Sequence, residues 1–246
     1  ARDLILSIIG MIGANGANYM AMEFGGEGLK TLNMSDRICI CNLCVEAGAK
    51  TALMEVDEIT LDYLKAHGRE PKHNFKSDED AAFAKVYDID LSTIKPIVAK
   101  PHFVDSVVDA EECAGTHIDE AFLGSCNNGR IEDLRVGAEL IKGKKVHPLV
   151  RFLVVPASAE VYRQALAEGI IDIFMEAGAI VMNPNCSVCW GSCQGVIGEG
   201  ETLISTGTRN FKGRAGHKDS FVYLASAATV TASAIKGEIT TAENVG

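Results

Sequence analysis

The stretch Ala179-Ile-Val-Met-Asn-Pro-Asn-Cys-Ser-Val-Cys-Trp-Gly191 joins a short apolar segment to a turn that carries two cysteines. Residues 179–182 are predicted to form a strand, and a proline and a glycine bound the turn after it. Cys186 and Cys189 have the C-x-x-C spacing of metal sites and of redox pairs. Because α/β sheets bind ligands just past the carboxyl ends of their strands, this turn is predicted to be a ligand site.

A second strand runs into a cysteine turn earlier in the chain. Residues 121–124 are apolar and lead into Gly124-Ser-Cys-Asn-Asn-Gly-Arg130, whose turn-forming residues offer backbone amides to sulfide or to substrate oxygens. Cys126 would add a third thiol to Cys186 and Cys189. A tetrahedral zinc site takes a fourth ligand, so three thiols favour an iron–sulfur cluster with one open iron. A thioredoxin-like redox pair is the other functional alternative.

Strand and helix patterns alternate along most of the chain, which predicts an α/β fold with layered parallel-sheet units. Strands are expected at 50–56, 86–91, 121–124, 149–155, 179–182 and 202–206, with an extended stretch at 19–24. Helices are expected at 2–13, 35–48 (with Ser35 as its N-cap), 57–64 (capped by Asp57), 104–113, 131–142, 159–168, 170–177 and 222–236. The polar segment 68–82 is the predicted boundary zone. We expect residues 1–90 to belong to an α/β domain that starts upstream, and residues 91–246 to form a second α/β domain with the cysteine motifs.

Composition narrows the class of protein. The 246 residues are 47% hydrophobic and 23% charged, as in an ordinary globular chain. The net charge of −10 argues against binding to nucleic acid or to an anionic membrane. No apolar run approaches the roughly 20 residues of a membrane span. The eight cysteines occur in clusters rather than at the density of a secreted disulfide scaffold, which favours a reducing compartment, the cytoplasm.

The other cysteines are expected to be structural. Cys39, Cys41 and Cys44 lie in an apolar helical stretch, and a four-cysteine zinc site with Cys186 and Cys189 would need a spacing far longer than in compact zinc modules. The remaining pair, Cys113 and Cys193, is also assigned to structure.

Two further groups of residues have the chemistry of a substrate site. Asn42 and Glu46 are four residues apart and therefore share a helix face. A solvated polar stripe would explain them, but a carboxylate among Ile, Cys and Leu neighbours is costly unless it is paired or used. Arg209 and Arg214 lie in Thr208-Arg-Asn-Phe-Lys-Gly-Arg214, just after a strand, and guanidinium groups bind carboxylates with two hydrogen bonds.

Four segments together resemble the aconitase superfamily and, within it, the large subunits of 3-isopropylmalate dehydratase and homoaconitase. They are C-N-L-C-V-E at 41–46, G-S-C-N-N-G-R at 124–130, N-P-N-C-S-V-C-W-G at 183–191 and T-R-N-F-K-G-R-A-G at 208–216. The order is consistent from residue 1 to about 240. The sequence departs from the family pattern at Asn127, where threonine is usual, and at Thr208, where many members have asparagine.

The resemblance implies a role for each matched residue. Cys126, Cys186 and Cys189 would hold a 4Fe–4S cluster with one open iron, which the isolated chain can lose. Glu46 and Asn42 would be catalytic residues. The substrate would be bound by Arg209, Arg214, Asn128 and Ser125.

The resemblance also implies an activity and a partner. The activity is that of a hydro-lyase of leucine biosynthesis, which isomerises 2-isopropylmalate and 3-isopropylmalate by dehydration and rehydration. Homoaconitase, 2,3-dimethylmalate dehydratase and other hydroxy-acid hydratases are alternatives, and a metal-stabilised binding or regulatory module is the non-enzyme alternative. A separate small subunit would carry the swivelling domain. The family's Asp-Ser-His-Thr segment would precede residue 1, so we expect the later part of a large subunit, inactive alone.

Overall fold

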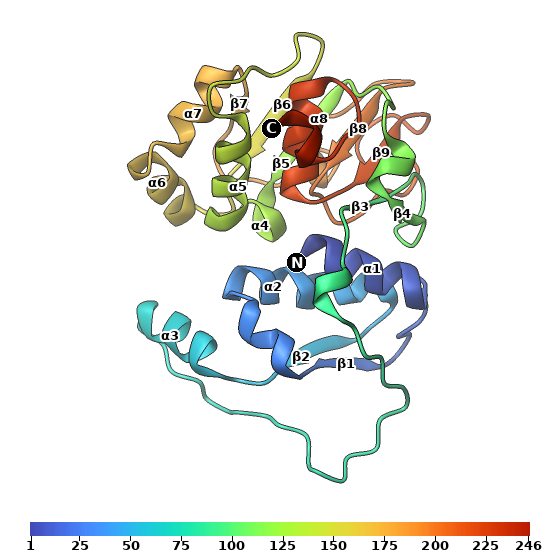
Figure 1. Ribbon diagram of the computed structural model, residues 1–246, viewed down its shortest axis with the longest axis vertical. Helices are drawn as coiled ribbons and strands as arrows, with labels where there is room; N and C mark the ends of the chain where they lie inside the picture. The colour runs from blue at the N-terminus through green and yellow to red at the C-terminus, as the bar shows by residue number, and fades with distance from the viewer.

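The structure is a computed structural model that describes residues 1–246, and its main element is a seven-stranded sheet (Figure 1). The strand order is β4-β3-β9-β8-β5-β6-β7. Their bounds are β3 Ile97–Ala99, β4 Val107–Asp109, β5 Glu120–Gly124, β6 Arg151–Val155, β7 Ile180–Val181, β8 Thr202–Ser205 and β9 Phe221–Leu224. Strands β9, β8, β5, β6 and β7 are parallel, whereas β3 and β4 are antiparallel at one edge. The predicted α/β class with parallel pairing is confirmed.

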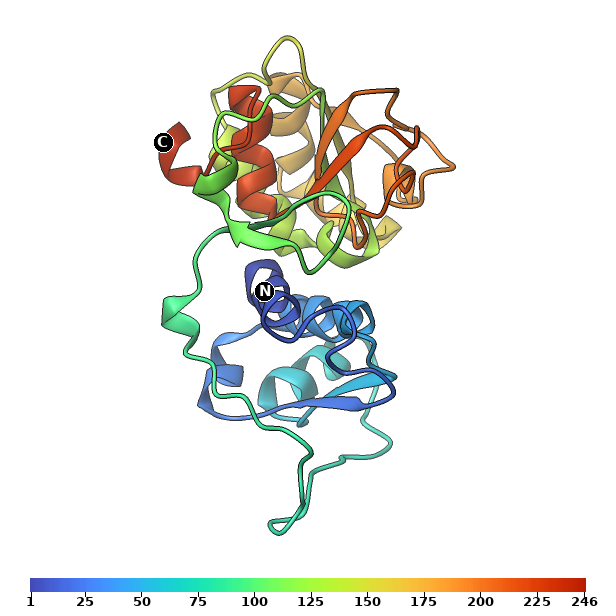
Figure 2. The same ribbon diagram turned by 90° about the vertical axis from the view of Figure 1, so that its right-hand side faces the viewer.

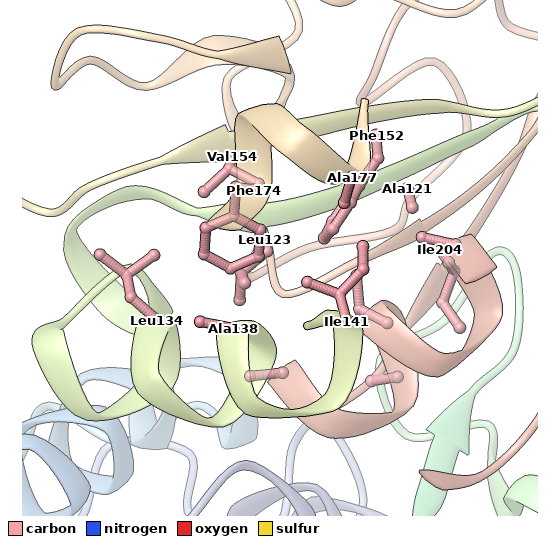
Figure 3. Packing of buried hydrophobic residues seen from close by; sticks show 14 of the residues in the cluster. Ala121, Leu123, Leu134, Ala138, Ile141, Phe152, Val154, Phe174, Ala177 and Ile204 are labelled. Carbon is pink, nitrogen blue, oxygen red and sulfur yellow. The ribbon is translucent and has the colours of Figure 1, made fainter. Parts of the chain in front are cut away.

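Helices that follow the strands in the chain cover one face of this sheet. They are α5 Ile131–Ile141, α6 Ala159–Ala167, α7 Ile170–Ala177 and α8 Ala227–Lys236. Figure 3 shows Leu134, Ala138 and Ile141 of α5 directed at Phe174 and at alternate residues of the strands. Gly137 allows α5 to approach closely, because a Cβ there would lie 2.8 Å from Leu123 Cδ2. Local βα units therefore build the first core.

The opposite face is covered by segments far away in the sequence. Helices α1 (Arg2–Ile12) and α2 (Met34–Leu43) lie between the seven-stranded sheet and a smaller sheet (Figures 1 and 2). Ile5 and Ile40 share a second core with Phe122, Leu153 and side chains from segment 188–215. This core contains residues from both sides of position 90, and the division into domains at that position stays a prediction.

The smaller sheet has two parallel strands, β1 (Ala21–Phe24) and β2 (Thr51–Met54). Helix α3 (Glu58–Ala66) follows, and the side chain of Asp57 accepts a hydrogen bond from the Thr60 amide, which confirms the predicted cap. The chain then returns to β3 through a long segment that extends away from both sheets (Figure 1). Short 3-10 turns complete the structure: η1 Glu27–Thr31, η2 Cys44–Ala47, η3 Leu91–Thr93, η4 Ala110–Cys113, η5 Ser187–Cys189 and η6 Ala242–Val245.

Several predicted elements are wrong. Residues 86–91 form no strand, and residues 104–113 contain β4 and η4 instead of a helix, because β4 pairs with β3 across a loop at 100–106. The stretch 222–236 is a strand followed by a helix, since Phe221–Leu224 pairs with β8. The helix predicted for 35–48 ends at Leu43, and its cap is Asn33, which forms a capping box with Asp36.

No helix of the structure has both the length and the apolar character needed to cross a bilayer.

Candidate active site at the carboxyl edge of the sheet

Cys126 lies where β5 ends. Ser125 takes a left-handed φ of 58° between β5 and the short helix α4 (Ser125–Asn128), and the Cys126 side chain after it is exposed. A Cβ on Gly124 or Gly129 would lie 2.7 Å or 2.3 Å from the Val155 carbonyl oxygen, so only glycine lets this turn pack against the end of β6. Left-handed backbone is costly for residues other than glycine and gathers at functional sites.

Cys186 and Cys189 flank a second strained serine. Ser187 is buried with φ 45°; its amide donates to Asn185 Oδ1 (2.6 Å) and its Oγ donates to the Gln194 carbonyl (2.9 Å). Cys186 is exposed and Cys189 half-buried, and all eight cysteines are free thiols. The turn thus presents its cysteines from a backbone fixed by internal hydrogen bonds.

The cysteine turn packs against the loop that carries the arginines. A Cβ on Gly191 would lie 1.9 Å from the Arg214 carbonyl oxygen. A Cβ on Gly207, just past β8, would lie 3.6 Å from Cys189 Sγ. Because β8 and β5 are parallel neighbours, Cys189 and Cys126 both lie at the carboxyl edge of the sheet.

The structure does not assemble the predicted ligands into one group. No set of three or more His, Cys, Asp or Glu side chains is placed to hold a metal ion. Cys126 lines a cavity of about 350 Å³ with residues of α3, α5 and α6, whereas a separate cavity of about 690 Å³ is lined by Cys193 and by the residues just before Cys186. Cys186 and Cys189 share a turn, and Cys126 does not form a metal-binding group with them in this structure.

Burial separates the structural thiols from the candidate ligands. It raises the pKa of the Cys39, Cys41 and Cys113 thiols and raises that of Cys44 to about 12, so these groups stay protonated near neutral pH. Thiolates, not thiols, bind metals. Cys193, assigned to structure from the sequence, is instead exposed, and its Sγ lies 3.6 Å from Asn185 Oδ1.

Glu46 and Arg209 form an ion pair across 163 positions of sequence. Arg209 Nε donates to Glu46 Oε1 at 2.8 Å, and the Glu46 side chain is only 12% exposed. Within the chain Arg209 donates through Nε alone, which leaves its terminal nitrogens for a carboxylate. Arg214 lies in the same loop with its guanidinium 5.6 Å from the Phe211 ring centroid, and its buried Nε has no partner.

A chain of amides connects Asn42 to the turn around Cys126. Asn42 Nδ2 donates to Asn127 Oδ1 (3.0 Å), and Asn127 Nδ2 donates to Asn128 Oδ1 (3.1 Å). Asn128 Nδ2 donates to Asp133 Oδ1 (3.0 Å), a carboxyl whose pKa is raised by burial. Both amide atoms of Asn128 thus have internal partners, and its substrate contact, like that of the buried Ser125, stays a prediction.

Sequence reasoning missed three residues of this region. In the sequence Asn127 differs from the family pattern without indicating a contact, and Asp133 stands at the third position of α5, where an acidic residue is a usual helix-start signal. Arg2 is almost fully buried; its Nη1 donates to the Gly207 carbonyl (2.9 Å) and its Nη2 to the Thr206 carbonyl. It ties α1 to the start of the arginine loop.

Comparison with known proteins gives independent evidence for the family of this chain. The sequence pattern of the Aconitase family (aconitate hydratase) matches residues 1–116 and 108–237. The chain is 48% identical over 246 residues to the 3-isopropylmalate dehydratase large subunit of Caldicellulosiruptor saccharolyticus, covering 100% of this chain and 57% of that protein. It is 50% identical over 240 residues to the probable 3-isopropylmalate dehydratase large subunit of Methanothermobacter thermautotrophicus, covering 98% and 57%.

A third relative, 3-isopropylmalate dehydratase large subunit 1 of Archaeoglobus fulgidus, is 49% identical over 240 residues, which are 97% of this chain and 57% of that protein. The chain thus spans a little over half the length of the curated relatives it matches. The match nevertheless extends over both the α1–α2 segment and the seven-stranded sheet. On this evidence, the chain belongs to the aconitase family.

Proposed function

We propose that this chain is the part of a hydro-lyase large subunit that binds the iron–sulfur cluster and the substrate carboxylates, and that the enzyme interconverts 2-isopropylmalate and 3-isopropylmalate. The observation that carries the proposal is the Glu46–Arg209 pair, which joins two predicted site residues at the carboxyl edge of the sheet. The 48–50% identity to proteins named 3-isopropylmalate dehydratase large subunits supports it.

Cys126, Cys186 and Cys189 are the residues that would hold the cluster. Their donor chemistry fits this group, because they are free, accessible thiols on turns at the edge of one sheet, while the buried thiols keep their protons. When bound, a 4Fe–4S cluster with one iron free of protein ligands supplies a Lewis acid for the substrate hydroxyl.

The arginine loop would bind and orient the substrate. Arg209 has two terminal nitrogens without partners in the chain. The buried Nε of Arg214 also has no hydrogen-bond partner. Each guanidinium can donate paired hydrogen bonds to a carboxylate, and two fixed carboxylates determine which face of the substrate is presented to the reacting group.

Glu46 and Asn42 would contact the reacting hydroxyl. The bond from Arg209 engages only Glu46 Oε1, so Oε2 is free to accept the proton of a hydroxyl group. Asn42 is anchored through Nδ2 to Asn127, which leaves its Oδ1 as a second acceptor. The base that removes the carbon-bound proton would come from a small subunit, a partner implied by the "large subunit" names of the relatives. The eight free thiols support the cytoplasm as the compartment.

The test uses the complete large subunit with its small subunit, reconstituted anaerobically with iron and sulfide. Arg209→Lys keeps the charge but removes the paired hydrogen bonds, so kcat/KM for 3-isopropylmalate should fall about 100-fold, equivalent to roughly 3 kcal/mol. The control is Arg163→Lys, because Arg163 is exposed on α6 and lines neither of the two cavities.

A panel of hydroxy acids in the same assay separates the related activities. Preference for homoaconitate or 2,3-dimethylmalate would replace the substrate in the proposal. Equal activity of Arg209→Lys and wild type, or stoichiometric zinc in colourless protein after anaerobic purification, would contradict it.

A further inference from the structure

A fully buried carboxyl group lies beneath the cysteine turn. Glu120 is the first residue of β5, is 0% exposed, and is paired in register with Arg151 of β6. Its Oε2 accepts a hydrogen bond from Arg151 Nε at 2.9 Å. The terminal nitrogens of Arg151 donate to both oxygens of Glu201, at 3.0 and 2.8 Å. One arginine therefore bridges a buried carboxyl and a partly exposed one.

The second oxygen of Glu120 faces the segment that carries the cysteines. Oε1 is buried without a hydrogen-bond partner. A Cβ on Gly195 would lie 3.5 Å from this oxygen and 3.5 Å from Ser187 Oγ. Ser187 is the left-handed residue next to Cys186. An unsatisfied buried oxygen costs about 1–3 kcal/mol, so a group retained in this place calls for an explanation.

The same network also holds the far end of that segment. Glu201 Oε2, which Arg151 binds, accepts the Gly198 amide at 2.7 Å. Residues 187–198 themselves contain no charged side chain. Glu201 therefore holds the end of the segment that returns to β8, and the unpaired oxygen of Glu120 lies next to Gly195 in its middle.

We propose that Glu120 is a positioning residue for the cysteine turn: its buried carboxyl, held by Arg151, keeps the Ser187–Gly195 segment in place and thereby sets how Cys186 and Cys189 are presented. The inference rests on the proposed function in treating these cysteines as cluster ligands. The positioning itself is a property of the chain without metal or substrate.

The protonation state of Glu120 gives the proposal a measurable signature. Burial raises the pKa of this carboxyl to about 7, and Glu201 acts in the same direction, whereas Arg151 lowers it. The charged groups that face Glu120 are therefore Arg151 on β6 and Glu201 before β8. Below pH 7 the neutral carboxyl can donate a hydrogen bond toward the segment. Above pH 7 the oxygen beside Gly195 becomes a buried acceptor carrying negative charge with no donor, and the segment should loosen.

The experiment measures alkylation of the metal-free complete chain with iodoacetamide between pH 6 and pH 8, resolved by site with mass spectrometry. Cys126 lies on another turn and serves as the internal reference for the general rise in thiolate with pH. In wild type the ratio of Cys186 to Cys126 labelling should rise about five-fold, with a midpoint near the pKa of about 7. In Glu120→Gln, which cannot ionise, the ratio should stay flat.

Glu27→Gln is the control, since Glu27 also pairs with a cation, Lys30, but is exposed on η1 and lines neither cavity. It should keep the wild-type rise. Glu201→Gln keeps the measurement informative if Glu120→Gln does not fold: loss of the Glu201 charge should move the midpoint to lower pH. A constant ratio in wild type, a rise retained in Glu120→Gln, or an unmoved midpoint in Glu201→Gln would overturn the proposal. Because no turnover is measured, failure here differs from failure of the proposed function.

Discussion

One face of the seven-stranded sheet is covered by helices that directly follow its strands, whereas the other is covered by α1, α2 and the segment 188–215. The first core contains Leu134, Phe174 and Val230, contributed by local βα units. The second contains Ile5 and Ile40, which lie about a hundred residues or more before most of the strands they cover. The predicted site residues Asn42 and Glu46 belong to the second side.

Neighbouring segments of the sequence therefore build one core, whereas distant segments bring the predicted site residues together. We call the face covered by α5, α6, α7 and α8 the local face and the opposite one the distant face. The local face is built from neighbouring segments, so it should form by short-range contacts and tolerate substitutions on the distant face. The distant face brings α2 to α4 and to the arginine loop, as the bonds Asn42–Asn127 and Glu46–Arg209 record. Substitutions in the core of the distant face should therefore disturb the candidate site before they disturb the local face.

The largest stability effect is expected on the local face. Phe174 is fully buried against Phe152, and Phe174→Ala should lower the free energy of unfolding by about 3–5 kcal/mol, measured in urea. Phe75→Ala is the matched control, because Phe75 is 71% exposed and should cost no more than about 0.5 kcal/mol. Similar losses from the two variants would mean that this face is not the main core.

On the distant face, Ile40→Ala should cost about 3 kcal/mol, since Ile40 is also fully buried. The loss should be uneven. Hydrogen exchange of the α1 and α2 amides should accelerate well before that of α5, because α5 keeps its own core. Uniform acceleration over the whole chain would show that the two faces unfold as one unit.

Acid should weaken the distant face through Asp57. Arg37, buried on α2, binds both Asp57 oxygens and lowers the pKa of that carboxyl to about 2. A carboxyl group whose pKa is lowered by folding stabilises the fold above its unfolded pKa, here about 3.8. This stability is lost as the pH falls toward 2. Asp57 is about one-third exposed, so solvent screening reduces its contribution to about 1–2 kcal/mol. The stability gap between wild type and Asp57→Asn should narrow between pH 4 and pH 2, and a constant gap would exclude this role.

The smallest effect tests whether the two sides use equivalent local signals. Asn33 caps α2 on the distant face, and Ser158 caps α6 on the local face. Either residue changed to alanine should cost about 1 kcal/mol in thermal unfolding, and Asn33→Asp should cost little because aspartate also caps helices. A much larger loss at Asn33 would indicate that its cap also supports the position of α2 over the sheet.

Local patterns were enough to predict most of the local face. Apolar runs bounded by glycine or proline located β5, β6 and β8, and amphipathic spacing located α5 and α7. The errors came where pairing partners are distant or unusual. The short strands β3 and β4 are defined by their antiparallel pairing with each other, and β9 merges with the alanine-rich α8 in the hydropathy pattern although Ser226 separates them.

The candidate site was predicted as residue types at strand ends, but not as contacts. Nothing local indicates that Glu46 binds Arg209, or that Arg2 reaches the carbonyls before the arginine loop, because these bonds join positions 163 and 205 apart. The asparagine at position 127 is explained only by its hydrogen bond with Asn42, which the sequence does not indicate. Side-chain burial, which distinguishes Cys39 from Cys126, also depends on packing between distant segments.

The close approach of Gly191 to the Arg214 carbonyl has a consequence for how the two halves of the site respond to each other. With no side chain to act as a spacer, the turn bearing the thiols and the loop bearing the guanidinium groups lie in direct backbone contact. A methyl group at position 191 would force the cysteine turn and the arginine loop apart. A ligand that binds to either segment should therefore change how the two segments pack, even if it contacts only one of them.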